Sequence, residues 1–329
     1  MKTFESSARH AGSGMVWIAG KVAQTRELTL LMVILVIMVV MTQLTPFFFT
    51  GANFRAMMIG LAPTAIIVVG MAILLVSGGF DLSVGAVLAL SGTAVALLMV
   101  NGVPPVAAVV ATLILGAAIG LGNGVIVTKL GVNPLVATLG AMSVARGIAL
   151  VLTEGFSISN LPSGFGYVGS EGFLGIPYIV LIMVVIVIVG DLALRNTRYL
   201  RQVYYIGGNE RAARLSGIAV DRVRISAYML TSILAALAGV LLASRLMAGT
   251  PTAGMALELQ VLAAAVIGGA TLGGGQGTVL GAFLGVIFVA LINNAMTMLA
   301  VSIYWQMVVT GVLLILAVTL DMLVRRRRK

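Results

Sequence analysis

Long apolar segments separated by short polar ones run along almost the whole chain. The first apolar run, residues 28–46, is long enough to cross a bilayer at about 1.5 Å per residue. Nine similar runs follow it, at residues 54–76, 83–100, 105–127, 134–153, 177–194, 223–246, 257–272, 278–298 and 303–324. The pattern predicts an all-α fold, a polytopic membrane helix bundle of about ten transmembrane spans that forms one domain over residues 28–324.

Both ends of the chain differ from this pattern. Residues 1–27 begin with a polar tail. No small-residue cleavage site follows the first apolar run, so we do not expect a cleavable signal peptide. Within it, Met15, Ile18, Ala19 and Val22 share one helical face, which predicts a helix lying in the membrane interface. Residues 325–329 are all basic and flank the last span, where anionic lipid headgroups attract them.

The distribution of charge predicts the orientation. If the N-terminus is cytoplasmic, 17 of the 20 basic residues lie on the cytoplasmic side, and only Arg55, Arg146 and Arg245 lie elsewhere. The longest outer loop, residues 154–176, then carries two glutamates and no basic residue. We therefore expect cytoplasmic N- and C-termini and an exposed cap or a short helix in the outer loop.

Composition narrows the function classes. The chain is 60% hydrophobic and 9% charged, which is far from an ordinary soluble domain. It has no cysteine and a single histidine, His10, so no thiolate metal site and no Ser-His-Asp or Cys-His catalytic set can be assembled. The net charge of +10 lies at the ends of spans, which argues against nucleic acid as a partner. We predict a membrane protein that is not an enzyme.

A charged loop, residues 195–224, interrupts the apolar pattern and contains seven arginines. At its centre Asn209 can cap a short helix, Glu210 follows it, Arg214 falls in the last turn and Gly217 can end it. A helix of about two turns is marginal in water by itself, because isolated helices need ~12–15 residues. This loop therefore predicts a docking partner.

Glycines mark close packing and chain breaks. Gly116, Gly120 and Gly124 share one helical face, and Gly281 and Gly285 repeat the spacing, which suits close helix packing. Two glycine-rich stretches, 78–85 and 268–277, can be either re-entrant breaks or turns. The second lacks the Gly-Lys-Ser/Thr ending of a phosphate loop, so no nucleotide site is expected there.

Polar residues inside the apolar runs or directly before them are candidates for a translocation pathway, because buried polar groups are costly in a membrane. The set comprises Asp81, Ser83, Asn123, Asn133, Thr138, Arg146, Asn293 and Asn294. Asp81 can instead cap the helix that begins at Leu82 or Ser83, and Asn133 with Pro134 begins the fifth span. Arg146 can line a pathway, pair with a buried group or reach the interface, and the asparagines can equally hold helices together.

Several stretches resemble one family, the permease subunits of bacterial ATP-binding-cassette importers for monosaccharides. They are Gly78–Gly85, Gly207–Ile218, Pro251–Gly254 with Glu258–Leu259, Gly268–Gly277, Asn293–Asn294 and Tyr304–Met307. The resemblance covers nearly the whole chain, and it departs from the usual pattern only at Phe80 and Gln276.

The resemblance implies a multi-pass protein of the bacterial inner membrane, with two cytoplasmic ATPase subunits, a second permease copy or sister permease, and a periplasmic sugar-binding protein as partners. ATP and magnesium would be bound in the ATPase subunits, with no cofactor bound by this chain. Gly207–Ile218 matches the coupling helix that docks into the ATPase. The residues expected to make that contact are Asn209, Glu210, Arg211, Ala212, Ala213, Arg214 and Gly217.

The sequence therefore predicts a permease subunit that forms the pathway for a small neutral sugar and is driven by ATP hydrolysis in its partners. Three other cargoes stay open for the same machine: a nucleoside, a branched-chain amino acid or a furanose-like signal molecule. A transporter driven by a proton or sodium gradient is a further alternative, but it gives the helix around Glu210 no purpose.

Overall fold

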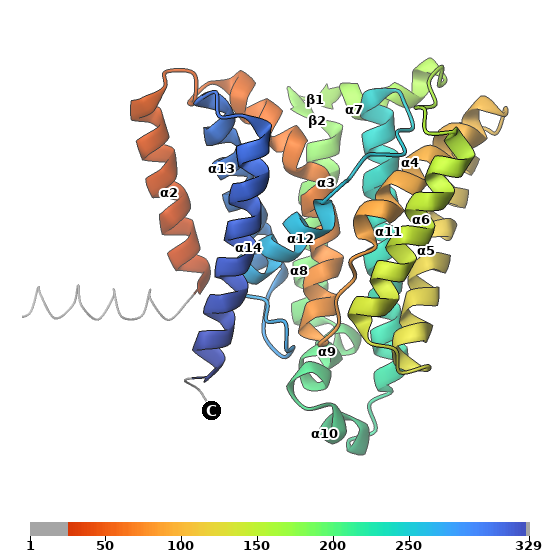
Figure 1. Ribbon diagram of the computed structural model, residues 1–329, viewed down its shortest axis with the longest axis vertical. Coiled ribbons are helices and arrows are strands. Elements are labelled where there is room, and N and C mark those ends of the chain that lie inside the picture. Colours follow the sequence, from red (N-terminus) through yellow and green to blue (C-terminus); the bar gives the residue numbers. More distant parts are fainter. Residues whose placement is uncertain (1–25, 327–329) are drawn as a thin grey trace, which may run out of the picture.

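The computed structural model describes residues 26–326, which form a bundle of long helices (Figure 1). The first five helices are α2 (Arg26–Leu44), α3 (Gly51–Val76), α4 (Val84–Val100), α5 (Pro105–Thr128) and α6 (Pro134–Thr153). The later long helices are α8 (Tyr178–Asn196), α11 (Val220–Leu246), α13 (Val279–Met298) and α14 (Ile303–Arg326), with the shorter α9 (Arg198–Gly208), α10 (Glu210–Leu215) and α12 (Leu257–Ile267) between them. The expected interfacial helix of residues 15–22 and the tail residues 327–329 lie outside the described residues.

Each of the ten predicted apolar runs contains a helix. Seven helices in the described part of the chain are at least 18 residues long and apolar enough to cross a membrane, whereas α4, α12 and the apolar part of α14 are shorter. The all-α membrane bundle is therefore confirmed. The run predicted over 257–272 ends early, because α12 stops at Ile267 and glycines follow.

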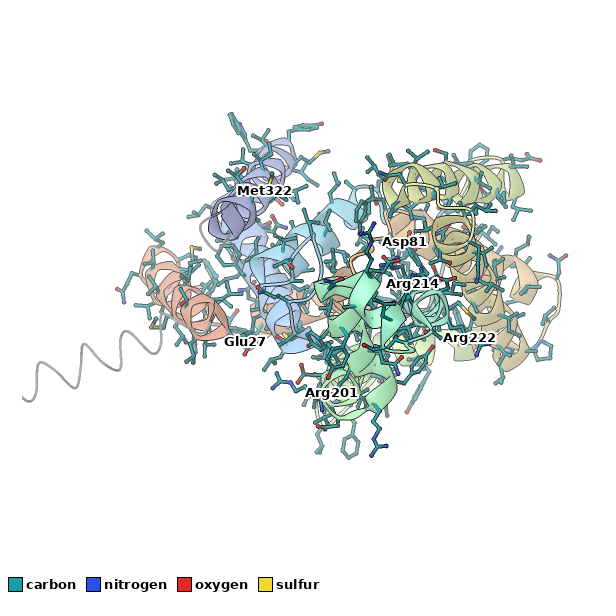
Figure 2. The ribbon with its side chains drawn as sticks, turned by 90° about the horizontal axis from the view of Figure 1, so that it is seen from below. Glu27, Asp81, Arg201, Arg214, Arg222 and Met322 are labelled. Carbon is teal, nitrogen blue, oxygen red and sulfur yellow. The ribbon has the colours of Figure 1, made fainter. Side chains whose placement is uncertain are left out.

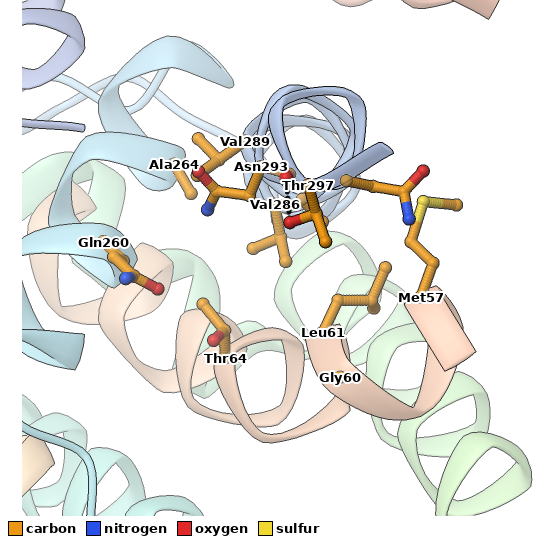
Figure 3. Close-up of a pocket in the computed structure, with 12 residues that line it drawn as sticks. Met57, Gly60, Leu61, Thr64, Gln260, Ala264, Val286, Val289, Asn293 and Thr297 are labelled. Atoms are coloured by element: carbon orange, nitrogen blue, oxygen red, sulfur yellow. Dashed lines mark hydrogen bonds between the residues drawn. The ribbon is translucent and has the colours of Figure 1, made fainter. Parts of the chain in front are cut away.

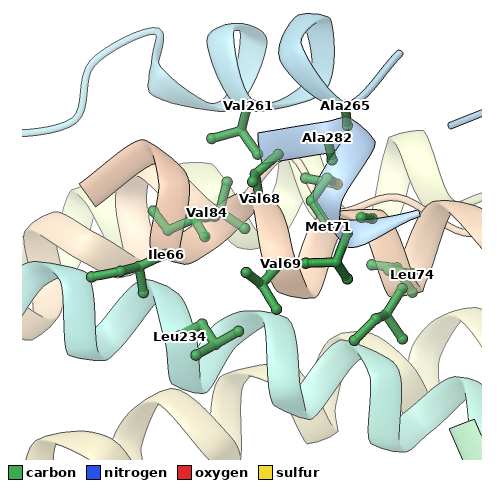
Figure 4. Close-up of a cluster of buried hydrophobic side chains, with 14 of the residues drawn as sticks. Ile66, Val68, Val69, Met71, Leu74, Val84, Leu234, Val261, Ala265 and Ala282 are labelled. Carbon is green, nitrogen blue, oxygen red and sulfur yellow. The ribbon is translucent and has the colours of Figure 1, made fainter. Parts of the chain in front are cut away.

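Helices α3 and α11 form the centre of the bundle. In the most apolar window of α3, 83% of the residues are buried, compared with 17% in α2 at the edge. Between Ala56 and Phe80 the chain has no charged residue, so α3 can be apolar on every side and still be covered. Figure 4 shows its side chains Val68, Val69 and Met71 packed against residues of α11, α12 and α13.

Two connections turn back into the interior. After α3 ends at Val76, residues 77–83 lead inward, and α4 begins at Val84 among buried residues (Figure 1). After α11, residues 247–256 do the same from the opposite end, and α12 begins at Leu257. The two connections meet where a Cβ on Gly254 would lie 2.9 Å from the Gly85 carbonyl oxygen. The stretch 78–85 is thus a break inside the bundle rather than a turn outside it, and α4 continues from it to the opposite end of the molecule.

The second glycine-rich stretch, 268–277, behaves differently. It turns at the end of the molecule that carries α9, where the Gly275 backbone nitrogen donates to the Val76 carbonyl at 2.8 Å. Four of its glycines have positive φ, at Gly269, Gly274, Gly275 and Gly277. This region is therefore a turn between α12 and α13, which agrees with the absence of phosphate-loop residues.

The two ends of the molecule differ in character. The first residue of α2 and the last turn of α14 lie at the same end as α9 and α10 (Figure 1). The opposite end carries the outer loop, with a 3₁₀ turn at Ser163–Gly166, α7 (Tyr167–Ser170) and the hairpin β1 (Gly172–Phe173) and β2 (Ile176–Pro177). The loop predicted to be the outer one therefore contains a short helix, which is one of the two forms expected for it.

Helix α9 was not predicted as an element. Thr197 caps it by accepting from the Leu200 backbone nitrogen at 3.4 Å, and Val203 and Ile206 are buried. Its apolar positions are interspersed with Arg198 and Arg201, so it is an amphipathic surface helix whose apolar face is too short to be recognised among the arginines.

Candidate functional site

The short helix α10 forms where the sequence predicts it. The Asn209 side-chain oxygen accepts from the Ala212 backbone nitrogen at 3.0 Å, which satisfies one of the free donors at the helix start. Gly217 has φ +81°, the left-handed conformation that ends the helix. Both backbone expectations are confirmed.

A chain of alternating charges fixes α10 to the bundle. Lys129 at the end of α5 pairs with Asp221 at 2.7 Å, and Asp221 pairs with Arg214 at 2.8 Å. Arg214 also contacts Glu210 at 3.0 Å. Glu210 in turn accepts from Arg224 of α11, again at 3.0 Å. The charge network, Lys129–Asp221–Arg214–Glu210–Arg224, therefore connects three helices through α10.

The Glu210 carboxylate is held in its charged form. Partial burial opposes ionisation, but the hydrogen bonds and charges of Arg224 and Arg214 outweigh it and keep the pKa of Glu210 below its ordinary value. Because Glu210 begins α10, its negative charge also suits the positive end of the helix dipole.

One face of α10 is open. Ala213 is buried against the bundle, whereas Arg211 and Ala212 are exposed and Leu215 is 89% exposed. Figure 2 views the molecule from this end and shows Arg201, Arg214 and Arg222 on the same surface. A fixed short helix that presents an apolar side chain among basic ones has the form of a docking element.

Asp81 lies fully buried at the start of α4. Its Oδ1 accepts from the Ser83 backbone nitrogen at 2.8 Å and from the Ser83 hydroxyl at 2.6 Å. Its Oδ2 accepts from Asn123 of α5 and from Ser232 of α11, both at 3.4 Å. This buried polar cluster joins three helices, and none of its four members is more than 2% exposed. The predicted helix start at Leu82 or Ser83 is wrong, because α4 begins at Val84 with Ser83 as its N-cap and no side chain caps it. Asp81 instead binds Ser83 from the turn before the helix.

Arg146 anchors the second inward connection. Its Nη1 donates at 2.7 Å both to the Pro251 carbonyl and to the Ala253 carbonyl. Glu258 of α12 lies near enough to attract it electrostatically. Of the three sequence interpretations, the structural one fits best, because the Pro251 and Ala253 carbonyls both accept from one nitrogen of this half-buried guanidinium.

A cavity with both apolar and polar lining residues lies between one helix of the N-terminal half and two helices of the C-terminal half. This cavity has a volume of about 220 Å³ and lies between α3, α12 and α13 (Figure 3). Its polar lining residues are Thr64, Gln260, Asn293, Asn294 and Thr297. Asn294 also exchanges two hydrogen bonds with Asn53, at 2.7 and 3.1 Å, so it joins α13 to α3. The structure therefore brings Asn293 and Asn294 to one cavity and separates them from Asp81, Ser83 and Asn123.

The two remaining candidates make local contacts. Asn133 is exposed and accepts from the Leu135 backbone nitrogen at 2.9 Å, so it caps α6. Thr138 is buried and donates to the Pro134 carbonyl of its own helix at 2.8 Å. Neither reaches the cavity or the buried polar cluster.

Sequence reasoning missed four polar residues that these sites use. They are Asn53, Thr64, Gln260 and Ser232. Gln260 carried a usable signal, since it is a glutamine inside a predicted apolar run. Thr64 and Ser232 carried no such signal, because serine and threonine are common where membrane helices pack together. Among the described residues, no cluster of three or more His, Cys, Asp or Glu side chains is placed to hold a metal ion.

Comparison with known proteins identifies the chain. A family profile described as "Branched-chain amino acid transport system / permease component" matches residues 53–318. The chain belongs to this family. It is thus a multi-pass membrane permease, and the predicted assignment to transport permeases rather than enzymes is confirmed.

Individual relatives are similar over most of their length. The ribose import permease proteins of Bacillus subtilis and Escherichia coli K12 are 41% and 40% identical to this chain, over 84% of it and 87% and 88% of their own lengths. The D-allose transport system permease protein of Escherichia coli K12 is 35% identical over 85% of the chain and 86% of its own length. No solved structure gives a significant match. The resemblance to permeases of monosaccharide importers is confirmed.

Proposed function

We propose that this permease forms the translocation pathway for a small neutral sugar and is driven by an ATPase that docks on α10. The observation that carries the proposal is α10 itself, a short helix fixed by the charge network and presenting Leu215 almost fully to solvent. A helix this short does not persist by its own propensity, so the network that holds it in place favours a mechanical role.

The arrangement of the ends supports this orientation. The end with α9 and α10 carries most of the loop arginines and the basic end of α14, as expected for the cytoplasmic face. The N- and C-termini are then both cytoplasmic. The ten apolar helices make up about ten spans, and in two of these spans an inward connection leads into α4 or α12. The outer loop with α7 would face a periplasmic sugar-binding protein.

The cargo assignment rests on the cavity and on the relatives. Amide and hydroxyl groups both donate and accept hydrogen bonds, which matches the hydroxyl groups of a neutral sugar. A volume of about 220 Å³ holds roughly seven waters at ~30 Å³ each, enough for one monosaccharide. None of its lining residues is charged. This favours a sugar over an amino acid, whose two charges need charged partners.

The remaining partners are proposed from the same mechanism. Alternating access needs the permease to move against a second subunit, either another copy or a sister permease, with one ATPase beneath each. ATP and magnesium would be bound by those ATPases, and this chain would contribute the pathway and α10. A change of state in the ATPase then shifts the balance between the two conformations of the permease.

Replacing Leu215 with serine tests the docking role. We expect Leu215→Ser to reduce copurification of the ATPase from detergent by about ten-fold, because fully burying a leucine side chain contributes about 1.5–3 kcal/mol. The matched control is Leu174→Ser at the outer end, where Leu174 is 86% exposed compared with 89% for Leu215. Equal copurification of both variants would refute docking at α10.

Uptake in proteoliposomes that contain the assembled importer tests the cargo. We expect unlabelled ribose or allose to compete with radiolabelled ribose and leucine not to compete. Uptake should continue in the presence of an ionophore while ATP is supplied, since the energy comes from ATP. Competition by leucine alone would instead favour the amino-acid cargo named in the family description.

A further inference from the structure

The guanidinium of Arg224 connects α10 to the inward connection 77–83. One Nη2 atom donates both to Glu210 Oε2 at 3.0 Å and to the Ser77 carbonyl at 3.2 Å. Glu210 is the first residue of α10, and Ser77 is the residue that directly follows the end of α3 at Val76. Arg224 itself belongs to α11 and its side chain is only 16% exposed. A single nitrogen of Arg224 therefore links α10 to the start of the inward connection 77–83.

Ser77 is also the point where other parts of the cytoplasmic end converge. Next to it, the Val76 carbonyl accepts from the Gly275 nitrogen of the 268–277 turn at 2.8 Å. A Cβ on Gly207 would collide with the same Val76 carbonyl. The ends of α3 and α9 and the 268–277 turn therefore touch through backbone atoms at Val76 and Ser77, with no side chain between them to absorb movement.

The segment that follows Ser77 leads to the middle of the bundle. Asp81 ties it to α5 and α11 through the buried polar cluster. Beyond it, Gly85 touches Gly254 of the second inward connection, where Arg146 holds the Pro251 and Ala253 carbonyls. A displacement at Ser77 would therefore be passed on through direct contacts to Gly85 and Gly254, where the two inward connections cross.

A second nitrogen of the Arg224 guanidinium, Nε, is buried and has no hydrogen-bond partner within the described residues. A buried donor without an acceptor is costly and rare in folded proteins, so this nitrogen calls for a functional explanation. Within the described charge network, Arg224 is therefore the member with a buried donor that lacks an acceptor.

We propose that Arg224 is a positioning residue for transport, which passes the movement of α10 to residues 77–83 and through them to the crossing of the inward connections. This inference rests on the proposed docking of the ATPase on α10, and it adds the route by which docking reaches the pathway. It differs from a holding role because the contact to Ser77 is not needed to keep α10 folded. The Asn209 cap and the Glu210–Arg214 and Arg214–Asp221 pairs hold α10 without Arg224.

The test uses the assembled importer in proteoliposomes, with Arg224→Gln compared with Arg222→Gln. Arg222 lies two residues away and is exposed, so the control removes the same charge from the same surface. Sugar uptake and ATP hydrolysis are measured in the same vesicles. We expect Arg224→Gln to keep the ATPase bound and to lower sugar transported per ATP by about ten-fold, since a hydrogen bond to a charged group is worth about that factor in an equilibrium. Arg222→Gln should keep the normal ratio.

A second measurement follows the segment directly. The chain has no cysteine, so Phe80→Cys introduces a single thiol in residues 77–83, at a side chain that is half-buried. Its rate of reaction with a maleimide should change when ATP is added, and Arg224→Gln should abolish that change. The rate without ATP and the melting temperature report whether the variant is folded.

The outcomes separate the two proposals. If uptake per ATP is normal in Arg224→Gln, or if the thiol still responds to ATP, the role of Arg224 is refuted. Loss of the ATPase from Arg224→Gln would show that Arg224 only holds α10, which also refutes it. If Leu215→Ser still binds the ATPase, docking on α10 fails instead, whatever Arg224→Gln does.

Discussion

At the scale of single residues, the buried polar cluster shows how a charge is tolerated among apolar helices. Asp81 is fully buried, yet its two oxygens accept four hydrogen bonds, including one from the Ser83 backbone. Such a carboxylate is stable only while its donors stay in place. The cluster therefore fixes the start of α4 relative to α5 and α11.

Replacing Asp81 removes the acceptor but leaves its donors buried. We expect Asp81→Ala to destabilise the protein by about 2–4 kcal/mol, because each buried group left without a partner costs ~1–3 kcal/mol. Thermal unfolding in detergent measures this. Glu171→Ala is a control at an exposed carboxylate in the loop between α7 and α8, and it should cost under ~1 kcal/mol. A similar loss of stability in both variants would mean that the buried polar cluster contributes no more to the free energy of unfolding than an exposed carboxylate does.

Glu210 gives a pH-dependent contribution whose sign follows from its lowered pKa. The charged form is favoured in the folded protein, so the stabilisation is present above the ordinary pKa of a glutamate. It is lost as the pH falls through the lowered pKa. Since the side chain is 41% exposed, solvent screening keeps the effect below ~1 kcal/mol.

Comparing melting temperatures of the native chain and Glu210→Gln from pH 7 to pH 3 isolates this effect, because the other acidic groups titrate in both proteins. We expect the native chain to be more stable at pH 7 and the difference to shrink in acid. A difference that stays constant over this range would show that Glu210 is not held ionised by Arg224 and Arg214.

The sequence could predict residues whose partners are close along the chain. Asn209 and Gly217 cap and end α10 through neighbours a few positions away, so their roles were correct. Asn53 could not be recognised, because its partner Asn294 lies 241 residues further along the chain. Arg146 was left with three interpretations for the same reason, since its acceptors are backbone carbonyls of a distant segment.

At the scale of elements, helix packing was more predictable than helix ends. Gly116, Gly120 and Gly124 share a face of α5, and a Cβ on any of them would meet α11 within 3.0 Å. The spacing alone predicted this close approach. The end of α12 and the presence of α9 were missed, because glycines after Ile267 and arginines within α9 obscure the apolar period.

The glycine face of α5 gives a matched pair of substitutions. A Cβ on Gly120 would lie 2.6 Å from the Tyr228 carbonyl oxygen and 2.7 Å from the Met229 Cα, both backbone atoms that cannot rotate away. We expect Gly120→Ala to destabilise the protein by about 1–3 kcal/mol. On the same helix, Gly122 has open space around it, so Gly122→Ala should be neutral or stabilising by up to ~1 kcal/mol.

Thermal unfolding in detergent distinguishes these two variants by sign. The same loss of stability in both would mean that helix propensity, rather than the contact with α11, decides the result. Because α11 also carries Arg224 and Ser232, this packing sets the position of the charge network and of the buried polar cluster together.

At the scale of the whole molecule, the two inward connections divide the interior into parts with different roles. Residues 77–83 approach from the end that carries α10, and residues 247–256 from the outer end. Broken helices near the middle of a bundle are the usual place for a solute site in transporters, because their free backbone groups and polar side chains face a cavity. The cavity between α3, α12 and α13 adjoins the second of these breaks.

Gln260 is the residue that places this cavity on the pathway. It lies one turn into α12, immediately after the inward connection, and its amide lines the cavity opposite Asn293 (Figure 3). If a sugar passes there, Gln260→Leu removes hydrogen bonds to it while keeping similar volume. We expect the KM for ribose uptake to rise about five- to ten-fold, which is the usual value of one neutral hydrogen bond.

The control is Gln43→Leu, the same change at an exposed position on α2 outside the cavity. Uptake is measured in vesicles with the assembled importer, and ATP hydrolysis in the same vesicles should stay near normal for both variants, because neither touches α10. Should Gln260→Leu transport ribose with the same KM as Gln43→Leu, the cavity would lie off the pathway. The proposed route would then have to run along the other side of α12, where Glu258 and Arg146 lie.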